Sequence, residues 1–223
     1  MSITNMDLLR RVPLFSLLTA AQAEAITHAV VKRRYKRGEA IVEQGCKSDT
    51  LYILLTGRAR VFATDSRGRE VIIAALQPGD YIGEMSIIDN EAHSATVRAE
   101  VQTDALTLGR GEFAHCLANN SSMAFMAMRG LVKRLRQADR KIESLALLDV
   151  YGRVARALLD FAEADAGGRQ VIREKISRQD LAKMVGASRE MVSRVMKDLG
   201  ERGFIEALPD GSTVLKSPLH SLA

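Results

Sequence analysis

The chain has 223 residues, of which 32 are Lys or Arg and 27 are Asp or Glu, so its formal net charge is +5. Hydrophobic residues make up 47%, which is enough to fill the cores of two ordinary domains and excludes a disordered chain. The positive excess permits nucleic-acid binding but does not establish it. No apolar run reaches the roughly 20 residues that a membrane helix needs.

The N-terminal sequence MSITNMDLLRRVPLF lacks the basic start, apolar run and small-residue cleavage site of a signal peptide, so we expect a cytoplasmic protein. The two cysteines, Cys46 and Cys116, stand alone. This argues against a disulfide framework, a zinc site and a cysteine-ligated iron–sulfur cluster. A redox role is an alternative for either thiol, although a solitary cysteine is usually a small apolar filler.

Short strands are predicted between residues 38 and 113, where glycines separate β-rich runs of roughly five to eight residues. DSRGR (65–69) and QPGD (77–80) have the composition of tight turns. The predicted strands are AIVEQG (40–45), TLYILLTG (50–57), RARVFATD (58–65), EVIIAAL (70–76) and DALTLG (104–109). Their spacing is typical of an antiparallel barrel or sandwich.

A long helix is predicted from about Ser122 to Leu148, a stretch without proline and with a single glycine, Gly130. Its apolar residues recur every three or four positions and stay close to a heptad seam. The columns of that seam are Phe125, Val132, Asp139 and Ala146, and Met128, Leu135 and Ile142. Such a stripe packs either on its own barrel or on the same helix of a second chain, and the pattern favours a homodimer.

A new segment starts with LLDVYGRVARALLDFAEA, where Asp149 can cap a helix. We therefore expect a first domain over residues 1–120, the long helix over 121–148 and a second domain over 149–223. DAGGR (165–169) is predicted to be a loop.

The stretch ISRQDLAKMVGASREMVSRVMKDLGERGFIEALPDGSTVLKS (176–217) predicts a winged helix-turn-helix. Ser177 caps a short helix, Gly186 and Ala187 form the turn, and Ser188 caps a second helix that ends near Gly200. Two strands around a Pro-Asp-Gly turn would then form the wing.

Polar side chains gather near the start of that second helix: Arg189, Glu190, Ser193, Arg194 and Lys197. An arginine can donate two hydrogen bonds to guanine N7 and O6, and a carboxylate can accept one from cytosine N4. A solvated charged face is the simpler alternative. The caps, the turn and the wing together favour sequence-specific reading of the DNA major groove.

These motifs resemble the Crp/Fnr family of bacterial transcription regulators over nearly the whole length. The resemblance rests on PGDYIGEMSIIDNEAHSATVRA, LALLDVYGRVARALL and ISRQDLAKMVGASREMVSRVMKDLGERGFI. It implies an α+β protein with an N-terminal cyclic-nucleotide-binding-type β-roll, a long dimerisation helix and a C-terminal winged helix-turn-helix. It also implies a homodimer on two-fold symmetric double-stranded DNA, with RNA polymerase as a further partner.

The resemblance also assigns roles to residues of the second domain. The SRExVSR signature at 188–194 implies that Arg189, Glu190 and Arg194 read bases in half-sites of the GTGA type. The expected phosphate contacts are Ser177, Arg178, Gln179 and Ser188.

In the first domain the resemblance implies an effector cassette of the form G-E-…-R-S-A. Gly83, Glu84, Ser94 and Ala95 match, but His93 stands where the arginine that neutralises a cyclic phosphate belongs. A charge-assisted hydrogen bond contributes about 1.5–3 kcal/mol. Histidine is mostly neutral at pH 7 and lacks the fixed fork of a guanidinium.

The base-contacting hydroxyl residues of the cyclic AMP receptor fall here on Ala138 and Asp139, and neither supplies that hydroxyl. Both departures argue against tight binding of cyclic AMP. Asp139 either pairs with Arg136 or Arg140 of either chain or accepts the N1–H and N2–H of a guanine nucleotide. A vestigial pocket in an effector-independent dimer is a further alternative.

Other functions have less support from the residues. A haem would need one of four histidines, and a lone histidine in a loop is more often a surface residue: His28, His93, His115 and His220. No metal-ligand spacing, nucleophile elbow, P-loop or paired-carboxylate site supports an enzyme. A nucleotide-binding subunit that regulates a partner protein is the remaining rival, and the predicted winged helix argues against it.

Overall fold

The computed structural model describes residues 12–216 and residue 219, and the chain separates into two compact units. Unit 1 is Met1–Arg134 and unit 2 is Leu135–Ala223. The boundary between the units falls inside the long helix, whereas the predicted domains treat that helix as a separate element. The division into 1–120, 121–148 and 149–223 therefore stays a prediction.

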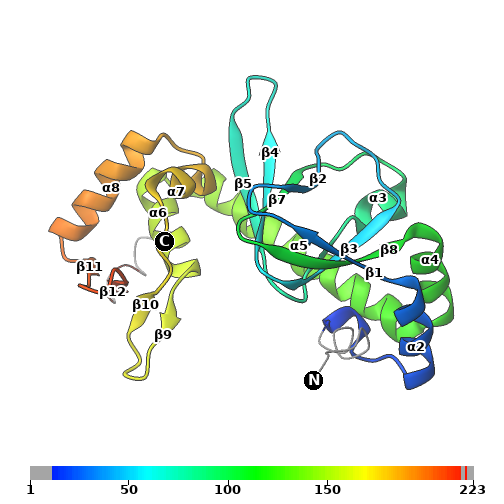
Figure 1. Ribbon diagram of the computed structural model, residues 1–223. Coiled ribbons are helices and arrows are strands. Elements are labelled where there is room, and N and C mark those ends of the chain that lie inside the picture. Colours follow the sequence, from blue (N-terminus) through cyan, green and yellow to red (C-terminus); the bar gives the residue numbers. More distant parts are fainter. Residues whose placement is uncertain (1–11, 217–218, 220–223) are drawn as a thin grey trace. The chain divides into compact units, whose positions relative to one another are not determined.

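Unit 1 is built on two antiparallel four-stranded sheets, with the strand orders β1-β8-β3-β6 and β2-β7-β4-β5 (Figure 1). The first sheet comprises β1 (Val31–Tyr35), β3 (Thr50–Thr56), β6 (Tyr81–Ile82) and β8 (Thr103–Gly109). The second comprises β2 (Ala40–Val42), β4 (Ala59–Thr64), β5 (Glu70–Leu76) and β7 (Thr96–Ala99). The helical elements are η1 (Pro13–Phe15), α2 (Ala20–Ala29), α3 (Glu84–Asp89), α4 (Arg110–Asn119) and α5 (Ser121–Leu147).

The core of unit 1 lies on both sides of β3 and β8. Leu51 and Ile53 belong to the cluster that also contains Phe113 of α4 and Met123 of α5. Leu54 belongs to the second cluster, with residues of β4 and β7. The alternation of side chains along a strand explains how one strand serves both clusters. The predicted antiparallel architecture is therefore confirmed.

Helix α5 confirms the predicted long helix to within one residue at each end. Met123 and Ala127 are buried against unit 1. The apolar seam lies on a different face, where Phe125, Met128, Val132, Leu135 and Ile142 are 49–65% exposed. The barrel therefore does not cover the predicted seam.

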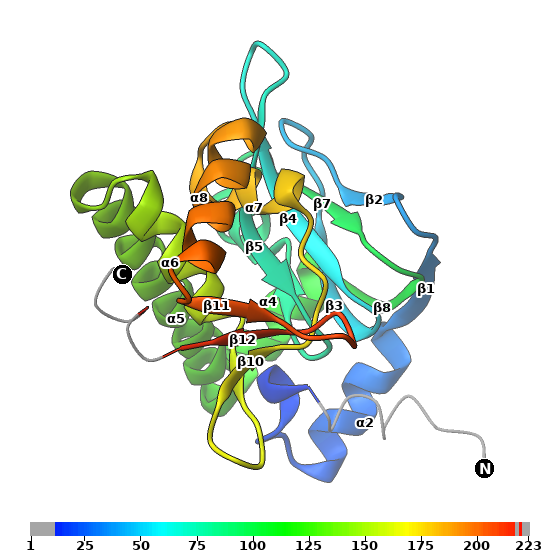
Figure 2. The same ribbon diagram turned by 90° about the vertical axis from the view of Figure 1, so that its left-hand side faces the viewer.

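Unit 2 contains the C-terminal part of α5, three further helices and a small antiparallel sheet with the order β11-β12-β10-β9 (Figure 2). The helices are α6 (Val150–Asp160), α7 (Arg178–Val185) and α8 (Arg189–Glu201). The strands are β9 (Glu163–Ala164), β10 (Gln170–Ile172), β11 (Ile205–Ala207) and β12 (Thr213–Leu215). Val154, Leu181, Val192 and Leu199 are almost completely buried where the three helices meet.

One turn occurs twice, once in each unit. In DSRGR, the Asp65 carboxylate accepts from the backbone N–H groups of Arg67 and Arg69 at 2.9 Å and from Arg69 Nε at 2.7 Å. In DAGGR, Asp165 accepts in the same way from the N–H groups of residues 167 and 169 and from Arg169 Nε. Gly68 and Gly168 both have a positive φ, of 75° and 77°.

The first of these turns confirms the predicted hairpin of β4 and β5, and the hydrogen bond from Asp80 N to Gln77 O confirms the turn at 77–80. The second confirms the predicted loop at 165–169. DAGGR forms the predicted loop as a turn between β9 and β10, and sequence reasoning missed both of these strands. Those strands have two and three residues, too few for an alternating pattern to be recognised.

Three strands and two longer helices of unit 1 were also missed: β1, β6, β7, α2 and α4. Strand β1 reads VKRRY and has four exposed residues before a buried Tyr35, because it pairs only with β8 at the edge of its sheet. An edge strand of this kind carries charge rather than an alternating apolar pattern. Among the described residues, none of the helices combines the length and the apolar character needed to cross a membrane.

Candidate DNA-reading helix and effector cassette

The helix pair α7–α8 is defined by caps that its own sequence supplies. Ser177 Oγ accepts from Asp180 N at 3.0 Å at the start of α7, and Ser188 Oγ accepts from Met191 N at 3.2 Å at the start of α8. Gly186 ends α7 with a φ of 65°. Both predicted caps and the predicted glycine turn are confirmed.

Helix α8 has one buried face and one exposed face. Val192, Val195, Met196 and Leu199 pack into the core of unit 2. Tyr151 of α6 donates to Asp198 Oδ2 at 2.7 Å, which ties α8 to α6. These contacts hold the buried face of α8 against the core of unit 2, and the opposite face is exposed to solvent.

The exposed face carries the predicted base readers, Arg189, Glu190, Ser193 and Arg194. Hydrogen bonds from its own backbone N–H and from Ser188 lower the pKa of Glu190, so this carboxyl is an ionised acceptor at neutral pH. Lys197, further along, lies 3.6 Å from Glu201. Arg178 and Gln179, predicted to contact phosphates, are exposed in the first turn of α7.

The predicted wing is present as the hairpin of β11 and β12, in which Ile205 pairs with Leu215 and Ala207 with Thr213. Asp210 accepts from the backbone N–H and the hydroxyl of Ser212 in the turn. These bonds lower the pKa of Asp210.

The effector cassette begins at the junction of β6 and α3. Gly83 has a φ of 91°, and a Cβ there would overlap the carbonyl oxygen of Thr50, so this position requires glycine. Glu84, the first residue of α3, is only 2% exposed. Its Oε1 is bonded to the guanidinium of Arg134, and its Oε2 is buried without a hydrogen-bond partner.

Arg134 of α5 is the cation of this site. It donates to Glu84 Oε1 and to the carbonyl oxygen of Tyr81, and its guanidinium carbon lies 4.8 Å from the centre of the Tyr81 ring. Burial raises the pKa of Glu84, and Arg134 opposes that shift. The cassette carboxylate is therefore already paired with a residue of the same chain.

His93 does not stand in for an arginine. Its Nε2 lies 2.8 Å from Ser48 Oγ, and its backbone exchanges hydrogen bonds with Gly45 and Cys46. Burial lowers the pKa of His93, which favours the neutral imidazole at pH 7. The side chain therefore ties the cassette to the loop between β2 and β3 and supplies no positive charge.

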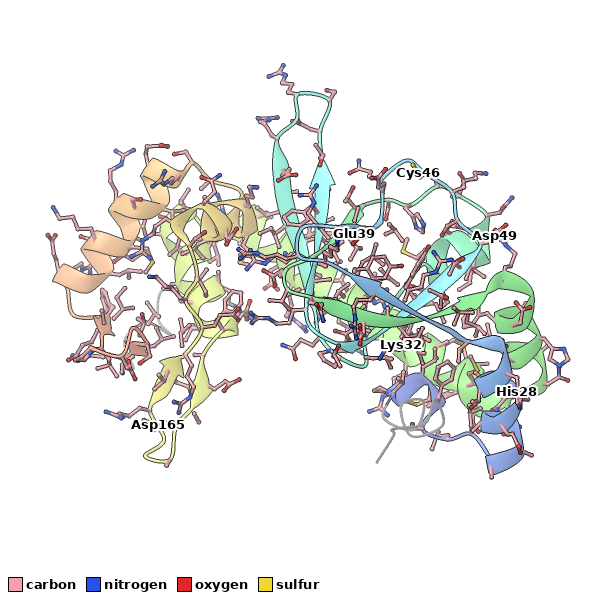
Figure 3. All side chains as sticks on the ribbon, viewed as in Figure 1. His28, Lys32, Glu39, Cys46, Asp49 and Asp165 are labelled. Carbon is pink, nitrogen blue, oxygen red and sulfur yellow. The ribbon has the colours of Figure 1, made fainter. Side chains whose placement is uncertain are left out.

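Arg110 links the same loop to the end of α3. Arg110, the first residue of α4, donates to Asp49 Oδ1 at 2.7 Å and to the carbonyl oxygens of Ser86 and Ile87 at the end of α3. Ser86 Oγ donates to Glu91 O at 2.6 Å. Figure 3 labels Cys46 and Asp49 on this loop.

The remaining predicted effector residues are less constrained. Ser94 is exposed and Ala95 is buried. Asp139 is an exposed residue of α5 in unit 2, and within the described chain no ion pair joins it to Arg136 or Arg140. Pairing with those arginines across a dimer, and a role for Asp139 in the pocket, stay predictions.

The two cysteines and the remaining histidines have separate surroundings in the described part of the chain. Cys116 packs against the core of unit 1, where burial raises the pKa of its thiol. Cys46 is exposed. His28 lies in the last turn of α2 and His115 on α4, while His220 lies outside the described residues.

Two family models match the chain, one in each part. A cyclic nucleotide-binding domain matches residues 32–120, and a Crp-like helix-turn-helix domain matches residues 152–218. The chain belongs to the Crp/Fnr family. The predicted resemblance is confirmed, and with it a fold that joins a β-rich cyclic nucleotide-binding domain and a long helix to a helix-turn-helix domain.

Relatives of this Crp/Fnr regulator are transcription regulators. The cAMP-activated global transcriptional regulator Vfr of Pseudomonas aeruginosa is 37% identical over 183 residues, which cover 78% of this chain and 84% of Vfr. A CRP-like cAMP-activated regulator of Mycobacterium tuberculosis is 28% identical over 97% of both chains.

A solved structure of the c-di-GMP responsive global regulator CLP of Xanthomonas campestris superposes with a TM-score of 0.75. It is 26% identical and covers 88% of this chain and 98% of its own. DNA-binding transcription regulation of the Crp/Fnr type is therefore the function of this chain.

Sequence reasoning missed the residues that complete the cassette of this Crp/Fnr regulator: Ser48, Tyr81, Arg110 and Arg134. Arg134 is 50 residues from Glu84 along the chain, and Ser48 is 45 residues from His93. Arg134 follows four residues after Gly130 on one helix face, and that glycine inside a helix was the available signal.

Proposed function

We propose that this Crp/Fnr regulator acts as a homodimer that reads a palindromic GTGA-type site through its two α8 helices. The observation that carries the proposal is the exposed face of α8. Arg189, Glu190 and Arg194 project from a helix that is capped by Ser188 and packed from behind. These are the side-chain types that discriminate guanine and cytosine in the major groove.

The exposed seam of α5 supports the homodimer. Large apolar side chains on a soluble surface normally mark an interface when they form a continuous patch. Phe125, Met128, Val132 and Leu135 recur with heptad spacing and are about half exposed or more. A parallel pair of α5 helices would bury this stripe and bring two reading helices onto one duplex. RNA polymerase is the expected partner on such a promoter.

The cassette supports regulation that does not depend on cyclic AMP. Glu84 is paired with Arg134, and His93 is neutral and bonded to Ser48, so the site lacks the free cation that a cyclic phosphate needs. The arginine at this place would contribute about 1.5–3 kcal/mol. We expect the dimer to bind its site in the absence of cyclic AMP.

A guanine nucleotide is the second candidate effector. Asp139 is exposed and forms no ion pair with the neighbouring arginines of its own chain among the described residues. A carboxylate can accept the N1–H and N2–H of a guanine together. The solved relative from Xanthomonas campestris is described as c-di-GMP responsive, which supports a guanine nucleotide as a candidate.

A gel-shift series tests the reading function. Purified protein is titrated onto a duplex with a GTGA/TCAC palindrome and onto a scrambled duplex of the same composition, at several salt concentrations. We expect a dissociation constant of about 10⁻⁸ M or lower on the palindrome, and at least about 10³-fold weaker binding to the scrambled duplex. Equal affinity for both duplexes would contradict the proposal.

Calorimetric titration tests the effector. Cyclic AMP, cyclic GMP and cyclic di-GMP are titrated separately into the protein. We expect cyclic AMP to bind with a dissociation constant above about 100 μM, which corresponds to less than about 5.5 kcal/mol. Tight binding of cyclic AMP would contradict the proposed loss of the phosphate site. Failure of all three would leave the effector-independent dimer.

A further inference from the structure

The single glycine of α5, Gly130, faces the aromatic ring of Tyr81. Glycine in a helix interior is unfavourable relative to alanine, so its presence calls for a local reason. A Cβ added at Gly130 would overlap the hydroxyl oxygen of Tyr81 and would lie 3.0 Å from the ring atom Cζ. The helix therefore has a notch at Gly130 that admits the phenol.

Tyr81 contacts one face of α5 at three places. Its hydroxyl donates to the carbonyl oxygen of Ala127 at 3.1 Å, its ring fills the notch at Gly130, and its carbonyl oxygen accepts from Arg134. These positions are three and four residues apart, so they share one side of the helix. Burial raises the pKa of Tyr81, which keeps the phenol protonated as a donor.

The same contacts reach the cassette. Strand β6 is only Tyr81–Ile82, and it leads directly into Gly83 and Glu84. Arg134 bonds both Tyr81 and Glu84, so the start of α3 and one turn of α5 are held together by a single guanidinium. The start of the cassette and the notched turn of α5 are therefore joined through Tyr81 and Arg134.

The opposite side of α5 carries the apolar seam, with Met128, Val132 and Leu135 exposed. The helix continues without a break to Leu147. Its position against the cassette consequently sets the position of the seam that the other chain would meet. A shift of the notched turn would change how the two seams pair.

We propose that Tyr81 and Gly130 form a lock that sets the position of α5 against the effector cassette and thereby sets the DNA affinity of the dimer. Both are positioning residues, because they act through the helix. The inference rests on the proposed DNA-reading dimer. It adds two coupling residues that are neither base readers nor members of the G-E-…-H-S-A sequence motif.

A double-mutant cycle tests the lock. Gly130→Ala adds a Cβ that overlaps the Tyr81 hydroxyl, and Tyr81→Phe removes that hydroxyl. The double variant combines both changes. Gly111→Ala is the matched control, because Gly111 lies in helix α4 and a Cβ there has no heavy atom within 4 Å. The dissociation constant for the GTGA palindrome is measured at 25 °C on protein shown to be folded by circular dichroism, and the dimer is measured by sedimentation equilibrium.

We expect Gly130→Ala to weaken DNA binding at least about tenfold and Tyr81→Phe to weaken it about two- to fivefold. The double variant should recover at least half of the lost DNA affinity on a logarithmic scale, because the Tyr81 hydroxyl oxygen that overlaps the new Cβ is absent. Gly111→Ala should bind as the wild type does. Local packing without coupling would lower the melting temperature but leave the affinity of the folded protein unchanged.

Three results would overturn the lock. The first is wild-type affinity in folded Gly130→Ala, and the second is no recovery in the double variant. The third is failure of Gly130→Ala to fold together with wild-type affinity in Tyr81→Phe. If the wild type itself does not bind the palindrome, the proposed reading function fails instead. The lock is then decided by whether Gly130→Ala weakens the dimer and Tyr81→Phe restores it.

Discussion

Helix α8 and the effector cassette belong to different domains of one family fold. They differ in whether their polar side chains face solvent or are hydrogen-bonded within the protein. On α8, Arg189, Glu190 and Arg194 project outward while apolar contacts hold the helix from behind. In the cassette, Glu84 is paired with Arg134 and His93 with Ser48. Polar side chains that face solvent can bind a ligand. Polar side chains that are hydrogen-bonded within the protein instead stabilise the local structure.

The largest expected effect comes from the apolar seam of α5, the proposed dimer interface. Leu135 is 61% exposed, and Leu135→Glu would remove an apolar side chain from each chain of a dimer and place two like charges together. We expect the dimer dissociation constant to rise at least about 100-fold, since burying each leucine contributes about 1.5–3 kcal/mol. Sedimentation equilibrium measures this change.

Gln137→Glu is the control for that variant, because it adds the same charge to the same exposed turn outside the predicted seam. A dimer of wild-type strength in Leu135→Glu would show that the seam is not the interface.

On the reading side, Arg189→Ala should remove one bidentate contact in each half-site. At about 1–3 kcal/mol per contact, the palindrome should be bound about 30-fold to 10⁴-fold more weakly. Lys197→Ala is the comparison, because Lys197 is exposed on the same helix and lies near Glu201. It should weaken binding to specific and scrambled duplexes alike. A fluorescence-anisotropy titration that gives both variants the same selectivity would refute the assignment of Arg189.

In the cassette, His93→Arg would place a positive charge where the family motif has an arginine. We expect affinity for cyclic AMP to rise about 10- to 150-fold, the equivalent of one charge-assisted hydrogen bond. His93→Gln keeps a polar group beside Ser48 without adding charge and should leave the affinity unchanged. Calorimetry that shows no gain for the arginine would mean that the phosphate site is lost for another reason.

A smaller effect is expected where α6 begins. Asp149 Oδ1 accepts from Gly152 N at 2.8 Å, which confirms the predicted cap. Asp149→Ala should lower the free energy of unfolding by about 1 kcal/mol. Urea denaturation of the full chain measures it, with the exposed Glu143→Ala as the reference. An unchanged midpoint in Asp149→Ala would show that the cap contributes nothing measurable.

The smallest expected effect is on how the free energy of unfolding depends on pH. The folded pKa of His93 lies below its ordinary value of 6.5 because the ring is buried. Between that folded pKa and 6.5 the unfolded chain binds more protons, so stability falls as the pH falls through this window. The slope cannot exceed about 1.4 kcal/mol per pH unit for one group. Urea midpoints between pH 7.5 and about 5 should fall less in His93→Gln, and parallel curves would contradict this.

How far the sequence predicted these regions depends on the range of the contacts. Ser177, Ser188 and Asp149 act on groups three residues away, so their caps could be predicted from spacing alone. The seam of α5 and the buried face of α8 follow from helical periodicity in the same way. The cap and the buried face of α8 were therefore predicted, whereas the base-reading roles of its exposed residues stay a prediction.

The cassette could be predicted only in part, because its contacts are distant in sequence. The motif identified Gly83, Glu84 and the exchange at His93. The partners that decide what these residues do come from elsewhere: Arg134 from α5 and Ser48 from the loop after β2. Strand β1 escaped prediction for a related reason, since pairing with β8 rather than its own charged sequence makes it a strand.

The same five-residue turn occurs in both units, between strands of different length. Asp65 to Arg69 and Asp165 to Arg169 make the same hydrogen bonds although one joins long strands and the other joins strands of two and three residues. In both segments these hydrogen bonds join residues within the five-residue stretch itself. The two segments should therefore be interchangeable, and a chain in which they are swapped should keep both hairpins in register.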